Sequence, residues 1–145
     1  MRKFPALLIP TALLCGCQTV ENTLTTSPAL VTVTGPTASA IAGDMASRLV
    51  EHIGQAGATT IKMERDGSEF ATALEAALEG WGYRVVTDGR VTKNIKPFKL
   101  AYSIDGADGQ VLVRLSTPTI ALGRAYRPTA AGAIPASPLS IMQHN

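Results

Sequence analysis

One stretch decides the fold: Phe98-Lys99-Leu100-Ala101-Tyr102-Ser103-Ile104-Asp105-Gly106-Ala107-Asp108-Gly109-Gln110-Val111-Leu112-Val113-Arg114-Leu115. Its first seven residues alternate large apolar side chains with small or polar ones, which is typical of a strand with one buried face. Residues 105–109 predict a glycine-rich turn, and alternate residues of 111–115 are again apolar. The stretch therefore predicts a β-hairpin, and residues 120–126 predict a further strand after the break at Pro118.

Two segments before this hairpin have helical periodicity. In the first, apolar residues recur every four positions, at Ile41, Met45, Leu49 and Ile53. In the second, one face carries Phe70, Leu74, Leu78 and Trp81, and Asp66 or Ser68 is expected to cap its start. Residues 59–63 and 83–87 predict short strands. This order of elements predicts an α+β fold in which two helices pack on one face of a mainly antiparallel sheet.

The amino-terminal segment has the pattern of an export signal. Arg2 and Lys3 precede an apolar run over residues 4–14, which is too short to span a bilayer. The run ends in Leu14-Cys15-Gly16-Cys17, which resembles the lipobox of bacterial lipoproteins. This resemblance implies that Cys17 carries a diacylglycerol and becomes the mature amino terminus. An ordinary secretory signal with a coincidental cysteine is the alternative.

Processing at this point changes the charge and the cysteine content. The chain of 145 residues has 13 basic and 11 acidic residues, and loss of Arg2 and Lys3 leaves 11 of each. A neutral protein lacks the basic surplus that nucleic-acid binders use to neutralise phosphates. With Cys15 removed and Cys17 acylated, no thiol is left for a disulfide or a metal site. Gln18 follows the cysteine, and resemblance to sorted lipoproteins then favours the outer membrane.

The composition divides the chain into four parts. Residues 1–16 are expected to be the signal peptide, and residues 17–40 the acylated amino terminus with a flexible Thr/Ser/Pro-rich tether. Residues 30–33 are alternatively a short edge strand. The small α+β domain is expected over residues 41–126. Prolines and alanines dominate residues 127–145, which we expect to form an extended carboxy-terminal arm.

The sequence offers no convincing reaction centre, so we expect the protein not to be an enzyme, and we expect it to bind no cofactor, metal or small-molecule substrate. His52 is expected near the end of the first helix, and His144 in the arm. Asp105 and Asp108 suit a hairpin turn better than a calcium loop, because the required glutamate ligand is missing. A hydrolase that uses one of the serines is a weak alternative, since no base is evident near any of them.

Three surfaces are candidates for binding a partner. A basic stretch comprises Arg84, Arg90, Lys93, Lys96 and Lys99, and it either contacts acidic groups or is a solvated loop. Phe70 and Trp81 either serve an interface or belong to the core. Residues 133–142 mix prolines with apolar side chains. This part of the arm either binds a neighbour, by docking in a groove or adding a strand to its sheet, or folds back on the domain.

Taken together, these features make the chain resemble the TrbH family of conjugal transfer lipoproteins. The hairpin, Arg124-Ala125-Tyr126 and Pro135-Ala136-Ser137-Pro138 carry the resemblance most specifically, beside the lipobox at Cys17. The resemblance implies a structural component of a conjugative type IV secretion apparatus for mating-pair formation. Its partners would then be the membrane, through the lipid anchor, and the channel subunits. A stand-alone surface-exclusion or adhesion lipoprotein is the alternative.

Overall fold

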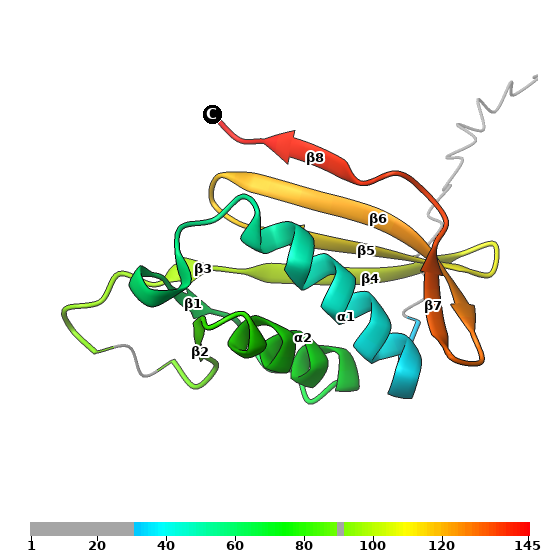
Figure 1. The fold of residues 1–145 in the computed structure, drawn as a ribbon, viewed down its shortest axis with the longest axis horizontal. Helices are drawn as coiled ribbons and strands as arrows, with labels where there is room; N and C mark the ends of the chain where they lie inside the picture. Colours follow the sequence, from blue (N-terminus) through cyan, green and yellow to red (C-terminus); the bar gives the residue numbers. More distant parts are fainter. Residues whose placement is uncertain (1–30, 90–91) are drawn as a thin grey trace, which may run out of the picture.

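The computed structural model describes residues 31–89 and 92–145, which form two helices, a short 3-10 helix and eight strands (Figure 1). In chain order these are α1 (Gly35–Val50), η1 (Ala56–Ala58), β1 (Thr60–Lys62), α2 (Glu69–Gly80), β2 (Arg84–Val86), β3 (Phe98–Lys99), β4 (Ala101–Ala107), β5 (Gln110–Ser116), β6 (Ile120–Thr129), β7 (Gly132–Pro135) and β8 (Ser140–Gln143).

The strands form a small parallel sheet and a larger antiparallel one. β1 is the central strand of the parallel sheet, which has the order β2-β1-β3. The antiparallel sheet has the order β4-β5-β6-β7, and β8 also pairs with β6. Only Leu100 separates β3 from β4, and its amide donates to the carbonyl of Lys62 in β1 at 2.9 Å. The fold is therefore α+β, as the sequence predicts, with a parallel unit that the sequence pattern did not show.

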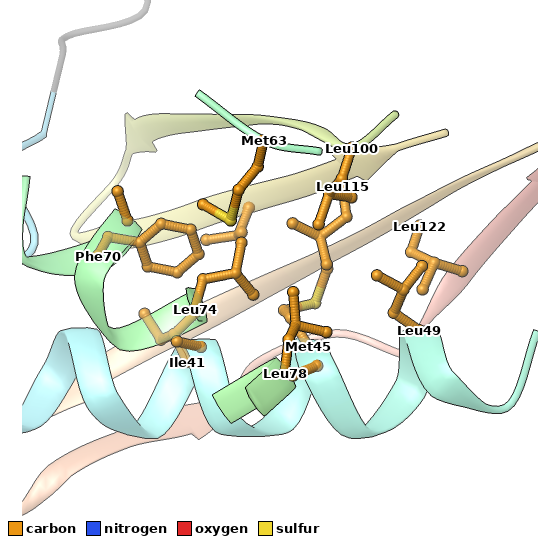
Figure 2. Packing of buried hydrophobic residues seen from close by; sticks show 14 of the residues in the cluster. Ile41, Met45, Leu49, Met63, Phe70, Leu74, Leu78, Leu100, Leu115 and Leu122 are labelled. Atoms are coloured by element: carbon orange, nitrogen blue, oxygen red, sulfur yellow. The ribbon is translucent and has the colours of Figure 1, made fainter. Parts of the chain in front are cut away.

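Both helices lie against the same face of the sheets, and the core fills the space between them (Figures 1 and 2). β5 contributes alternate residues to the core, and Val113 and Leu115 are fully buried there. Between the layers, Figure 2 shows side chains from both helices meeting those of the strands; these are Ile41, Met45, Leu49, Phe70, Leu74, Leu78, Leu115 and Leu122. The predicted apolar faces of both helices are thus buried, up to Leu49 in α1 and Leu78 in α2.

The predicted hairpin is confirmed, with β4 and β5 paired from Ala101↔Ser116 to Ala107↔Gln110. Asp108 and Gly109 connect the strands, and their φ angles are 52° and 73°. Two consecutive left-handed residues are typical of a type I′ turn, for which Asp-Gly is a favoured pair. The two residues therefore serve to close the hairpin.

Two details around the helices differ from the sequence predictions. α1 begins at Gly35, so residues 35–40 belong to the helix and not to the tether. It ends at Val50, which leaves Ile53 in the following turn. Trp81 is 55% exposed, because α2 ends at Gly80 and Trp81 is its C-cap residue. Residues 31–34 are not in a strand, and residue 30 lies outside the described part.

The carboxy-terminal segment is the main correction to the sequence analysis. Residues 127–145 were expected to form an extended arm without regular structure, but they include the end of β6 and the whole of β7 and β8. Pro128 lies in β6 beyond its ladder with β5, Pro135 ends β7, and Pro138 lies between β7 and β8. Each proline therefore occupies a position where its missing N–H interrupts no central ladder.

We predict that Ser68→Ala lowers the free energy of unfolding by about 1 kcal/mol, because the Ser68 hydroxyl caps α2. Its oxygen accepts from the amide of Ala71 at 3.1 Å. Ser47→Ala is a matched control, since the Ser47 hydroxyl donates only to the Asp44 carbonyl of its own helix. Urea unfolding followed by circular dichroism measures both variants. Equal losses of stability in both would show that the cap has no special role.

Candidate functional site

Cys17, the lipidation site predicted from the sequence, lies outside the residues that the structure describes. In the described part of the chain, no helix has both the length and the apolar character needed to cross a membrane.

The predicted catalytic and metal candidates are not brought together. Across residues 31–89 and 92–145, no three His, Cys, Asp or Glu side chains are placed so that they can hold a metal ion. His52 is exposed in the turn after α1, and His144 is exposed beyond β8. Asp105 is in β4, and Asp108 is in the hairpin turn.

A polar cluster that joins α1 to β6 lies beside the core. The Asp44 carboxylate accepts from Arg124 Nη1 at 2.9 Å and from the Tyr126 hydroxyl at 2.6 Å, both on Oδ2. Tyr126 is 1% exposed. Burial raises the pKa of its hydroxyl, and the hydrogen bond to Asp44 raises it further, so the group stays a donor. Asp44 thus fixes β6 to the helix from a position 80 residues away in the chain.

The same cluster holds the carboxy-terminal segment. Arg124 Nε donates to the Ser137 carbonyl at 3.1 Å, and the Ala125 amide donates to Ser137 Oγ at 2.9 Å. The Ala136 amide donates to the Ala125 carbonyl at 2.8 Å. These bonds fill the gap between the part of β6 that pairs with β7 and the part that pairs with β8. Residues 124–126 and 135–138, which carry the family resemblance in the sequence, therefore meet at one place.

These hydrogen bonds and the ladder with β6 hold β8 in place, but its side chains are exposed. All four of its residues are exposed, with Ile141 46% and Met142 62% accessible. Its ladder is with β6, and Figure 1 shows its other edge facing outward. A groove of about 460 Å³ runs beside β8, and its lining includes Leu112, Arg114, Gly123, Ser140, Met142 and His144. Of the two alternatives for residues 133–142, the structure shows that the segment folds back on its own sheet, where β8 presents a strand edge.

The other predicted surfaces separate in the structure. Phe70 is fully buried and packs against Tyr102 with ring centroids 5.1 Å apart, so it belongs to the core. Trp81 is exposed after α2. Of the basic stretch, Arg84 lies in β2, Lys99 in β3, and Lys93 and Lys96 in the loop before β3. Arg90 lies outside the described residues.

Sequence analysis missed the role of Asp44, and it also missed Lys62 as a neighbour of the basic stretch. Asp44 lies in α1 and contacts β6, so only the tertiary fold reveals its partners. Lys62 and Lys99 face each other because β1 pairs in parallel with β3. A local pattern in the sequence carries no signal for either contact.

We predict that Arg124→Gln lowers the free energy of unfolding by about 2 kcal/mol, because it removes the cation that contacts the partly buried Asp44 at 2.9 Å and leaves only Arg48, at 3.9 Å. Arg124 and Asp44 side chains are 16% and 25% exposed. Arg114→Gln is the matched control, since Arg114 is exposed on the sheet face away from the helices. Urea unfolding of the two variants gives the comparison. A loss below about 0.5 kcal/mol for Arg124→Gln would contradict the role assigned to the cluster.

The comparisons with known proteins agree with the resemblance seen in the sequence. A family model described as "Conjugal transfer protein TrbH" matches residues 19–145. A protein of Sinorhizobium fredii (strain NBRC 101917 / NGR234) named "Probable conjugal transfer protein TrbH" is 67% identical over 148 residues, which is 100% of both chains. No solved structure matches the chain. The chain therefore belongs to the TrbH family of conjugal transfer proteins.

Proposed function

We propose that this protein is a membrane-anchored lipoprotein that serves as a structural component of a conjugative type IV secretion apparatus for mating-pair formation. The observation that carries the proposal is the lipobox at Cys17 in a chain of the TrbH family. The described part of the chain adds an exposed strand edge at β8 that is suited to contact. The protein would thus contribute anchoring and assembly.

The anchor would be the diacylglycerol on Cys17, with a further acyl chain on the freed amino group. Each buried methylene contributes about 0.8 kcal/mol, and two or more chains give stable attachment. Gln18 after the cysteine favours the outer membrane, with the folded domain in the periplasm. The 17 residues from Gln18 to Thr34 span at most about 60 Å when fully extended. The domain would therefore reach subunits well away from the lipid surface.

The contact with other transfer proteins would use the free edge of β8. An unpaired strand edge offers backbone donors and acceptors to an added strand, and natural proteins usually protect such edges. β8 contains neither proline nor a charged residue, and its exposed Ile141 and Met142 would cover apolar side chains of the partner. An extended strand of a channel subunit is the occupant that this edge fits.

We predict that radioactive palmitate labels the wild-type protein and leaves Cys17→Ser unlabelled. Serine lacks the thiol that forms the thioether to diacylglycerol, so the variant should also keep its leader and run as a larger species on a gel. Cys15→Ser is the matched control and should be labelled and processed normally. Labelling of both Cys17→Ser and the wild type would contradict the anchor.

The strand-edge contact is tested with Gln143→Pro. Because the His144 amide donates to the Thr119 carbonyl, the alternation of an antiparallel ladder directs the Gln143 amide to the free edge. Proline removes this outward donor, so we expect fewer channel subunits to co-purify with the detergent-solubilised variant, as measured by quantitative mass spectrometry.

Gln143→Ala is the control, because it keeps the amide and should co-purify the subunits at the wild-type level. Equal recovery with both variants would show that the partner does not pair with this edge. If the wild type co-purifies no transfer protein at all, the proposed structural role fails in favour of a stand-alone surface-exclusion or adhesion lipoprotein.

A further inference from the structure

Two lysines face each other on neighbouring strands of the parallel sheet. Lys62 in β1 and Lys99 in β3 are register partners, next to the pair formed by Ile61 and Phe98. Ile61 is buried toward the helices, so the two lysines lie on the opposite face. Like charges held side by side repel each other and destabilise the pairing. Neither lysine makes a salt bridge within residues 31–89 and 92–145.

These two lysines form part of a basic cleft. The cleft has a volume of about 600 Å³, and its lining includes Lys62, Thr92, Lys93, Asn94, Lys96 and Lys99. None of the residues that line it is acidic. Four ammonium groups around one cleft create a local positive potential that an anionic partner would neutralise. A bound acidic group would therefore reduce the unfavourable electrostatic energy between Lys62 and Lys99.

A second cleft of about 660 Å³ adjoins the first, and both are lined by Lys62 and Lys99. Met63, Leu100, Ala101 and Pro118 give the second cleft an apolar wall, and Glu64 and Asp66 also line it. A ligand that spans both clefts needs negative charge toward the lysines and an apolar group beside it. Glu64 and Asp66 would repel the carboxylates of such a ligand. The ligand would therefore bind with its carboxylates toward the lysines and its apolar group in the second cleft.

The position of the clefts favours a protein partner over a lipid surface. Figure 1 shows β1, β2 and β3 at one end of the molecule and the first turn of α1 at the other. The chain reaches α1 from Cys17, so the basic end lies away from the point where the anchor joins the domain. An extended peptide segment matches two adjoining clefts, since side chains two residues apart in a strand point to the same face and can enter one cleft each.

We propose that Lys62, Lys93, Lys96 and Lys99 form a docking surface for an extended acidic segment of a partner protein, with an apolar side chain of that segment in the adjoining cleft. That the partner belongs to the transfer apparatus rests on the proposed function. The docking surface itself is separate from the edge of β8, because none of the residues lining either cleft belongs to that strand.

The test measures peptide binding to the full-length protein in non-ionic detergent. The probe is a short fluorescein-labelled peptide in which glutamate and leucine are two residues apart, so that both face the protein when the peptide is extended, and binding is followed by fluorescence anisotropy. We expect Lys62→Gln/Lys99→Gln to weaken binding about tenfold, equivalent to about 1.4 kcal/mol. Lys93→Gln/Lys96→Gln should weaken it as well. The matched control, Arg114→Gln/Arg127→Gln, removes two exposed charges elsewhere and should bind as the wild type does.

Three results would overturn the proposal. Equal weakening by the arginine and lysine variants would show that only net charge matters. Equal binding of a peptide with glutamine in place of glutamate would remove the role of charge. Sedimentation with phosphatidylcholine/phosphatidylglycerol vesicles that depends on Lys62 and Lys99, without peptide binding, would assign the surface to lipid. Palmitate labelling does not enter this experiment, so its failure and that of the anchor are distinguishable.

Discussion

The architecture depends on one strand that is shared among several partners. β6 pairs with β5 along one edge, and along the other it pairs with both β8 and β7. Between these two ladders, residues 124 and 125 of β6 pair with neither β7 nor β8. At this place a polar cluster supplies the missing hydrogen bonds, and its members are Asp44, Arg124, Tyr126 and Ser137. Since one carboxylate satisfies both Arg124 and Tyr126, the helix layer and the carboxy-terminal strands are fixed by the same contact.

This constraint explains how a small domain can present two separate surfaces. With residues 135–138 fixed against β6, β8 is held as an ordered edge instead of a free tail. In the other sheet, the parallel pairing of β1 with β3 sets Lys62 beside Lys99. A domain that carries a strand edge on one sheet and a basic cleft beside the other can contact two neighbours, as the proposed assembly role requires.

Local patterns in the sequence predicted those parts of the fold that local physics controls. The period-two alternation and the apolar face of α2 were sufficient signals, and the turn predicted over residues 105–109 is present but shorter, because β4 continues to Ala107. Trp81 fitted the helical period but lies past the last turn, where that period no longer determines burial. Pro128, Pro135 and Pro138 indicated an arm, because the pattern does not reveal that the first two lie in strands beyond the central ladder and the third in the connection between β7 and β8. Asp44 with Arg124, and Lys62 with Lys99, meet only through tertiary pairing.

Amide hydrogen exchange of the full-length protein, resolved by residue, tests the central claim most directly. The account predicts slow exchange at Ala125 and Ala136, whose amides donate to Ser137 Oγ and to the Ala125 carbonyl, at rates similar to those of β5. Exchange of residues 132–143 at the rate of an unstructured peptide, with β5 still protected, would contradict it. In that case the carboxy-terminal segment would be a free arm, and the strand edge presented by β8 would not exist.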